Sequence, residues 1–195
     1  MSGTILAIVE GQAEEEAIPL LLRRMLFRLD RLDVQVARPF RVKRTKVVRP
    51  GELERAVIQG SRDRIDISAV LVILDADDDE PLPLEGALLA RCREATPLPS
   101  AVVVAQRELE GWFLGCKDAL RGFRGIRANA NAPANPEEIR GAKERLSSNM
   151  EEGRRYLEIA DQPAFANRMD LELTLERCAS FRRLEAALRE ILPMP

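Results

Sequence analysis

The chain of 195 residues contains no histidine. This absence excludes a Ser–His or Cys–His nucleophile pair, a histidine ligand to zinc and acid–base catalysis by imidazole. The three cysteines, Cys92, Cys116 and Cys178, are far apart and form no Cys-x-x-Cys motif. They are too few for a disulfide framework or a zinc knuckle, and they are typical of buried thiols in a reducing cytoplasm.

Aromatic residues and long apolar runs are also scarce. Aromatic residues make up 4% of the chain, which argues against single-strand binding mainly by base stacking. No stretch approaches the roughly 18 apolar residues of a membrane span, and the apolar run from Ile5 to Val9 is followed by acidic residues, unlike a signal peptide. The 30 basic and 32 acidic residues nearly balance, so a polyanion site requires local clustering. We therefore expect a globular cytoplasmic protein that does not enter a membrane.

Short apolar runs alternate with segments of helical periodicity in the first 122 residues. The runs are rich in Val and Ile and cover residues 4–9, 34–37, 69–74 and 101–105. Nearly continuous runs of this kind are typical of a parallel sheet covered on both faces. The helical segments between and after them are 18–32, 52–60, 84–94 and 109–120, and Pro19 is expected in the first turn of its helix. The order predicts an α/β fold with a wound parallel sheet of about four strands and flanking helices.

The composition changes after residue 122. Residues 122–136 are rich in Gly, Asn, Ala and Pro and predict a long loop. Helical patterns follow over 136–149, 151–160, 171–178 and 181–192. We therefore expect two parts: an α/β core over residues 1–122, and a loop plus helical C-terminal subdomain over residues 123–195 that packs on the core.

Acidic residues directly follow three of the predicted strands. Glu10 follows the first, Asp75 and Asp77 follow the third, and Glu108 and Glu110 follow the fourth. The carboxyl ends of parallel strands share one edge, where such folds bind their ligands. Carboxylates gathered there need a compensating charge, and without histidine the natural candidate is a hard cation, Mg²⁺ or Mn²⁺. Two such ions would support in-line phosphoryl transfer.

Simpler interpretations of these acids exist. A glutamate after one strand is common, and the acidic run 75–80 by itself is typical of a solvated loop. The shared position at strand ends favours the metal site. The run does not match a calcium loop, because Glu80 and Gly86 stand where glycine and glutamate are required. An aspartyl phosphatase would have its Asp-x-Asp after the first strand rather than the third.

Several motifs together resemble a known family. Val-Glu-Gly-Gln-Ala-Glu at 9–14, with Pro19 beyond it, and Leu-Asp-Ala-Asp at 74–77 resemble the Toprim nuclease core of overcoming-lysogenization-defect (OLD) nucleases. Glu-Leu-Glu-Gly-Trp at 108–112 and motifs within 161–181 are similar to small Toprim-like proteins of a domain-of-unknown-function family, often encoded beside ATPases in phage-defence loci. The resemblance covers nearly the whole chain and implies a Toprim-like Rossmannoid sheet.

The resemblance also implies roles for the acids. It makes Glu10, Asp75 and Asp77 the catalytic residues, with Glu10 as an acid/base or metal-linked glutamate. The full set of implied metal ligands is Glu10, Glu14, Asp75, Asp77, Glu108 and Glu110. Ala13 stands where the family usually has a hydroxyl residue, which affects a helix cap rather than the chemistry. Trp112 and Tyr156 are expected to pack in the interior, and without a tyrosine-bearing domain the chain is no topoisomerase.

A basic segment follows the second predicted strand. Residues 38–49 hold six basic residues and no acid. Either they bind backbone phosphates of a nucleic acid near the acidic edge, or they form a solvent-facing strand extension whose charge discourages aggregation. The residues predicted to contact nucleic acid are Arg41, Lys43, Arg44 and Lys46. Lys143 is expected on a solvated helix face. No base-reading motif is present, so sequence readout is not expected.

The resulting hypothesis is a Mg²⁺- or Mn²⁺-dependent nuclease that hydrolyses phosphodiesters in a phage-defence or DNA-processing system. The alternative is a non-catalytic Toprim-derived subunit that binds a partner ATPase. A third possibility is a phosphotransfer enzyme acting on nucleotides.

Overall fold

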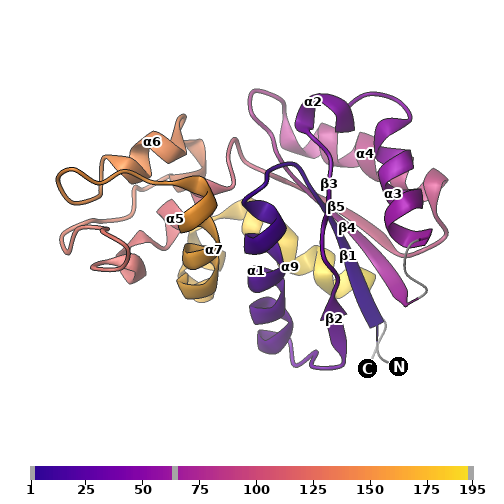
Figure 1. Ribbon diagram of the computed structural model, residues 1–195, viewed down its shortest axis with the longest axis horizontal. Helices are drawn as coiled ribbons and strands as arrows, with labels where there is room; N and C mark the ends of the chain where they lie inside the picture. The colour runs from indigo at the N-terminus through magenta and orange to yellow at the C-terminus, as the bar shows by residue number, and fades with distance from the viewer. Residues whose placement is uncertain (1–2, 63–65, 193–195) are drawn as a thin grey trace.

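The computed structural model describes residues 3–62 and 66–192, and within them five parallel strands form one sheet (Figure 1). The strands are β1 (Gly3–Val9), β2 (Val34–Val36), β3 (Phe40–Arg41), β4 (Ile67–Asp75) and β5 (Ser100–Ala105). Their order is β2-β1-β4-β5, and the short β3 pairs with the carboxyl end of β1. Each predicted apolar run coincides with one strand to within two residues, whereas the two-residue β3 was not predicted. The predicted α/β fold with a parallel sheet is confirmed.

Helices cover both faces of the sheet. Those of the first part are α1 (Glu14–Arg28), α2 (Arg44–Val47), α3 (Glu52–Arg62) and α4 (Pro81–Ala95). Alternate residues of β1 face opposite layers: Ala7 and Val9 pack in the cluster that contains α1, and Ile8 packs in the cluster that contains α3 and α4. This burial on both sides explains why the strand sequences are continuously apolar instead of alternating.

Helix α1 begins earlier than predicted. Its first turn carries Glu14, Glu15 and Glu16, whose negative charges are favourable at a helix N-terminus. Pro19 therefore lies inside the helix, and its expected place in the first turn was wrong. The N-cap is Ala13, which has no side-chain hydrogen bond to offer.

The rest of the chain is helical with long connections. Its helices are α5 (Glu110–Gly115), η1 (Lys117–Leu120), η2 (Pro136–Glu138), α6 (Ala142–Ser147), α7 (Glu158–Arg168), α8 (Leu171–Arg177) and α9 (Ala179–Ile191). The predicted helix over 151–160 is wrong. Gly153 takes a left-handed conformation (φ 77°), and Asp161 Oδ2 accepts a hydrogen bond from the N–H of Leu157, so α7 begins only at Glu158.

The C-terminal helices share an apolar core with the sheet. Helix α9 packs against β5, and α7 packs against α1 (Figure 1). One cluster of buried side chains includes Ile18 of α1, Phe165 of α7 and Leu184 of α9. Trp112 is fully buried, which agrees with its expected packing in the interior, and it donates a hydrogen bond to Ser180 Oγ. The boundary at residue 122 stays a prediction. Across residues 3–62 and 66–192, every helix is too short or too polar to span a bilayer.

Truncation of Phe165 tests how far α7 supports the fold. Its ring is fully buried and lies 5.6 Å from the ring centre of Phe113 and 5.8 Å from that of Tyr156. We expect Phe165→Ala to lower the free energy of unfolding by about 3–5 kcal/mol, because it leaves a cavity among aromatic rings. Phe27→Ala is the control, since this ring is 73% exposed, and its effect should stay within about 0.5 kcal/mol. Denaturant titration measures both, and equal effects would contradict the prediction.

Candidate metal centre

Backbone hydrogen bonds draw together the acids that follow β1, β4 and β5. Glu10 Oε1 accepts a hydrogen bond from the N–H of Asp75 at 3.2 Å. Glu14 Oε2 accepts one from the N–H of Glu10 at 3.1 Å. Asp75 Oδ1 accepts one from the N–H of Leu109 at 2.7 Å. The loops at the carboxyl ends of three strands are therefore fastened to one another by carboxylates.

Burial makes these carboxylates unusual acids. Glu14 and Asp75 are buried, and Glu110 is fully inaccessible. Burial, together with the charge of Asp77, raises the pKa of Glu10 to about 7, although the hydrogen bond from Asp75 opposes the shift. Burial and the neighbouring charge of Glu10 raise the pKa of Glu14 to about 8. Burial and the charges of Glu14, Glu10 and Glu110 raise the pKa of Asp75 well above its usual range. These acids form one mutually repelling cluster.

Glu110 joins the cluster from the start of α5. Its Oε1 accepts hydrogen bonds from the hydroxyl of Tyr156 at 3.0 Å and from Gln162 Nε2 at 3.2 Å. Burial raises the pKa of Glu110 as well. Tyr156 was expected only to pack, and this was incomplete, because its hydroxyl orients an acid of the site. Neither Tyr156 nor Gln162 has a local sequence pattern that points to this contact.

Glycine at position 11 allows this arrangement. A Cβ atom there would lie 2.8 Å from Glu14 Oε1 and 3.3 Å from Glu14 Cδ. Because the Glu14 carboxylate is buried and bonded to the N–H of Glu10, it has little room to move aside. Gly11 is thus required for the close approach of the loop to the carboxylate.

The cluster fits a hard divalent cation. Glu10 Oε2 and Glu110 Oε2 are buried without a hydrogen-bond partner in the described part of the chain. Carboxylate oxygens with raised pKa values and no donor are the ligand type that Mg²⁺ and Mn²⁺ prefer. Within residues 3–62 and 66–192, however, no three acidic or thiol side chains already stand as ligands of one ion. A cation here would keep part of its water shell, as Mg²⁺ usually does.

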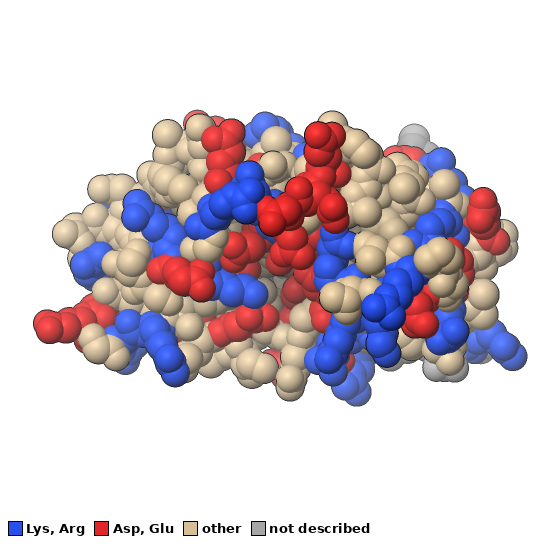
Figure 2. All heavy atoms as spheres, turned by 90° about the horizontal axis from the view of Figure 1, so that it is seen from above, with Lys and Arg blue, Asp and Glu red and all other residues tan. Residues whose placement is uncertain are grey.

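A pocket of about 260 Å³ opens beside the cluster, lined by acids and bases together. Its acidic residues include Asp75, Asp77 and Glu108. Glu108 Oε1 accepts a hydrogen bond from the N–H of Ala142, which ties the pocket to the start of α6. Figure 2 shows this face of the molecule, with acidic atoms in a band across its middle and basic atoms on both sides.

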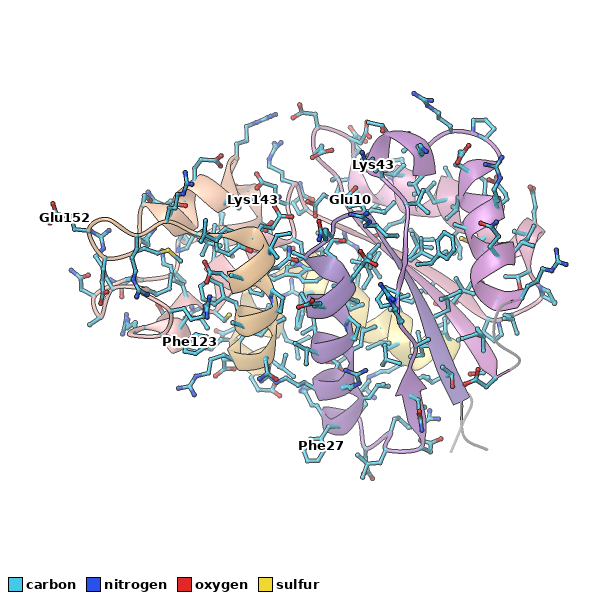
Figure 3. The ribbon with its side chains drawn as sticks, viewed as in Figure 1. Glu10, Phe27, Lys43, Phe123, Lys143 and Glu152 are labelled. Carbon is cyan, nitrogen blue, oxygen red and sulfur yellow. The ribbon has the colours of Figure 1, made fainter. Side chains whose placement is uncertain are left out.

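Lys143 is the one residue of the pocket that sequence analysis assigned to solvent. It lines the pocket, and its Nζ lies 2.9 Å from Glu158 Oε2. Burial by itself would lower the pKa of Lys143, but the charges of Glu110, Glu158 and Asp75 outweigh it and raise the pKa. In Figure 3, Lys143 and Glu10 both lie in the upper half of the view, and the charge of Lys143 lowers the pKa of Glu10. The expectation of a solvated helix face was therefore incomplete, because the side chain of Lys143 is 39% exposed but also lines the pocket.

The basic segment is partly engaged with acids of the chain itself. Arg44 Nε donates to the backbone oxygen of Asp75 at 3.0 Å, and its guanidinium also pairs with Asp79. Arg41 Nε lies 3.4 Å from Glu15 Oε2. Lys43 and Lys46 are exposed and form no ion pair with other described residues. Contacts of Arg41, Lys43, Arg44 and Lys46 with nucleic acid stay a prediction.

A comparison with models of protein families identifies the family of this chain. The model described as "Domain of unknown function (DUF4276)" matches residues 9–189. The chain belongs to this family. The match confirms the resemblance to a domain-of-unknown-function family that the sequence motifs indicate. No curated protein matches the DUF4276 chain.

Two solved structures are similar to the DUF4276 chain over most of its length. The C-terminal region of the Burkholderia pseudomallei OLD protein is 20% identical with a TM-score of 0.47, and the alignment covers 97% of this chain and 98% of that one. The C-terminal region of the Xanthomonas campestris pv. campestris OLD protein is 16% identical with a TM-score of 0.42, covering 95% and 93%. These values are too low to transfer the roles of residues, so the site rests on this chain's own contacts.

The raised pKa values predict how stability depends on pH without a cation. Glu10 and Glu14 ionise near pH 7 and 8 in the folded chain but near 4.5 when unfolded. Between these values the folded state binds more protons, so the free energy of unfolding should fall as pH rises from about 5 to 8. Thermal unfolding in EDTA across this range measures the slope.

Glu14→Gln should make this slope shallower, because it removes one titrating group from the cluster. Glu16→Gln is the matched control in the same helix turn, since Glu16 is exposed. A stability that is constant or rises over the range would contradict the burial of these acids.

Proposed function

We propose that the chain is a divalent-metal-dependent nuclease that hydrolyses phosphodiester bonds of nucleic acid. The observation that carries the proposal is the buried acid cluster, with unpartnered oxygens on Glu10 and Glu110, next to a pocket lined by Lys143. The proposal also rests on the motif resemblance to Toprim nucleases and needs neither histidine nor a reactive thiol. All three cysteines are buried, which agrees with this chemistry.

The residues proposed to hold the cation are Glu10, Asp75 and Glu110, with Asp77 and Glu108 at the mouth of the pocket. A bound divalent cation would act there as a Lewis acid and neutralise charge on the phosphate oxygens. Glu14 positions Glu10 through its backbone N–H. Tyr156 and Gln162 fix the orientation of Glu110 through its Oε1. Supporting contacts of this kind commonly tune a metal site as strongly as the ligands do.

Two groups of the chain suit the chemistry of hydrolysis. Glu10 Oε2 is unpartnered, and without a cation the pKa of this carboxyl is raised to about 7, so at neutral pH Glu10 either binds the cation directly or accepts a proton from an attacking water. Lys143 remains positively charged because acids surround it. It can therefore stabilise the negative charge that grows on the phosphate in the transition state.

Gly11→Ala tests whether the cluster binds a cation. The added methyl group would push the Glu14 carboxylate away from the loop, so we expect Mn²⁺ affinity to fall by about tenfold or more. Gly86→Ala is the matched control, because a Cβ at Gly86 meets no atom within 4 Å. Isothermal titration calorimetry with Mn²⁺ measures both variants. Equal affinities for the two variants would contradict the placement of the site.

Cleavage of plasmid DNA and of RNA with Mg²⁺ or Mn²⁺ tests the activity. We expect cleavage by the wild type, and rates lower by about 10²-fold or more for Glu10→Gln, Asp75→Asn and Lys143→Met. Glu16→Gln should cleave like the wild type, because its side chain is exposed and outside the cluster.

Each failure in this assay has a distinct meaning. A wild type that binds Mn²⁺ but cleaves neither nucleic acid would contradict the nuclease proposal and favour a phosphotransfer enzyme acting on nucleotides. A wild type that neither binds Mn²⁺ nor cleaves would favour the non-catalytic subunit that works with a partner ATPase. Cleavage by Asp75→Asn at the wild-type rate would show that a contaminating nuclease is responsible.

A further inference from the structure

Two arginines that sequence analysis did not single out line the acidic pocket. Arg107 lies between β5 and α5, and Arg140 lies just before α6. They come from the two predicted parts of the chain, and each reaches the same acidic loop after β4. Their guanidinium groups are the functional features of the pocket that the proposed metal centre does not use.

The backbone at Arg107 is held in a costly conformation. Arg107 and Asp77 both have left-handed backbones, with φ of 63° and 52°. The N–H of Asp77 donates to the backbone oxygen of Arg107 at 3.0 Å, so each loop holds the other in place. Residues other than glycine keep such conformations only where the surrounding structure enforces them, and these positions cluster at functional sites. The hydrogen bond between these two loops brings the side chains of Arg107 and Asp77 to the same pocket.

The Arg107 guanidinium has bonding capacity left. Its Nε is buried without a hydrogen-bond acceptor among the described residues. Its Nη1 lies 3.5 Å from the backbone oxygen of Asp77 and 3.6 Å from Asp78 Oδ1, both at the long limit for a contact. A buried donor without an acceptor is rare and calls for an explanation. A ligand oxygen in the pocket would supply that acceptor.

Asp78 now occupies the space between the two arginines. Its Oδ1 accepts a hydrogen bond from Arg140 Nη1 and also faces Arg107 Nη1. The Asp78 side chain is 77% exposed, and ion pairs so exposed are weak. A guanidinium binds carboxylate and phosphate with the same fork of donors. Asp78 therefore presents to the arginines the chemistry that a phosphate would present.

The size of the pocket restricts what enters it. Its volume of about 260 Å³ corresponds to roughly nine water molecules at about 30 Å³ each. This is room for a phosphate group and its hydration but is below the range typical of pockets for larger ligands. None of the residues that line it is aromatic, so it offers no platform for stacking a base.

We propose that Arg107 and Arg140 form a clamp for one backbone phosphate of a nucleic acid, and that Asp78 fills this clamp until the phosphate displaces it. The proposal rests on the proposed function, because it assigns the substrate contact of the same pocket. It replaces the exposed segment around Lys43 as the main phosphate contact. It also explains recognition without sequence readout, since only the phosphate group enters.

Binding of a short fluorescein-labelled oligothymidylate, followed by fluorescence anisotropy with Ca²⁺ in place of Mg²⁺, tests the clamp. We expect Arg107→Gln to weaken binding about tenfold and Arg140→Gln about threefold, because each removes a charge-assisted donor to phosphate. Asp78→Asn should tighten binding about two- to fivefold, since it removes the competing carboxylate of a weak exposed pair.

Matched controls separate the clamp from a general charge effect. Glu80→Gln removes the same charge from the same exposed loop, but Glu80 forms no ion pair with a described residue. Arg189→Gln removes a positive charge from α9, away from the pocket lining. Thermal unfolding checks that Arg107→Gln is folded, and Arg107→Lys, which keeps the charge without the fork, should bind with intermediate affinity.

The possible results distinguish failure of the clamp from failure of the proposed nuclease activity. Equal gains from Asp78→Asn and Glu80→Gln, unchanged binding in both arginine variants, or no binding by the wild type would each overturn the clamp. Cleavage is scored separately with Mg²⁺. Wild-type cleavage together with unchanged binding in the variants contradicts the clamp alone, whereas the expected binding pattern without wild-type cleavage contradicts the nuclease alone.

Discussion

Burial of several carboxylates at one edge of the sheet is the constraint on which the rest of the structure depends. Moving a carboxylate out of water carries an effective penalty of several kcal/mol unless hydrogen bonds or opposite charge replace the lost hydration. The chain supplies a backbone N–H to Glu10, Glu14 and Asp75, and a hydroxyl and an amide to Glu110. These donors come from different parts of the chain, so the acids join the carboxyl ends of β1 and β4 to the start of α5 and to α7.

These hydrogen bonds do not replace all of the lost hydration, and excess negative charge remains in the cluster. These donors leave Glu10 Oε2 and Glu110 Oε2 unpartnered, and Lys143 and Arg44 supply positive charge against several negative charges. The excess charge is removed either by protons, which the raised pKa values describe, or by a cation. Because protons and a cation compete for the same oxygens, cation binding must release protons. Burying several carboxylates costs free energy that packing alone does not recover. A role in binding explains the cluster better.

The sequence predicted those features of the molecule that depend on the local pattern of residues. The apolar runs around β1 and β4 and the acids that follow them were found because strand burial and the carboxyl edge of a parallel sheet need no long-range information. Lys143, Tyr156 and Gln162 reach the site through the packing of the loop between residues 122 and 141 and of α7, which no spacing rule encodes. The failed helix over 151–160 has a local cause, because the left-handed Gly153 interrupts a pattern that composition alone favours.

Two arginines hold the acidic loop after β4 in different ways. This difference determines which contact a phosphate can displace. On one side Arg44 has a side chain only 15% exposed and grips both Asp79 and the backbone of Asp75. On the other side Arg140 is 69% exposed and holds Asp78. Screening by water and salt weakens the Arg140–Asp78 pair more, because both of its side chains are exposed. Arg44, in contrast, is shielded and also bonds the backbone of Asp75. The loop can therefore release Asp78 to an incoming anion while Arg44 keeps Asp75 in the cluster. Arg44, which was predicted to bind nucleic acid, thus anchors the loop, whereas the contact proposed to exchange is made by Arg140, which lines the pocket.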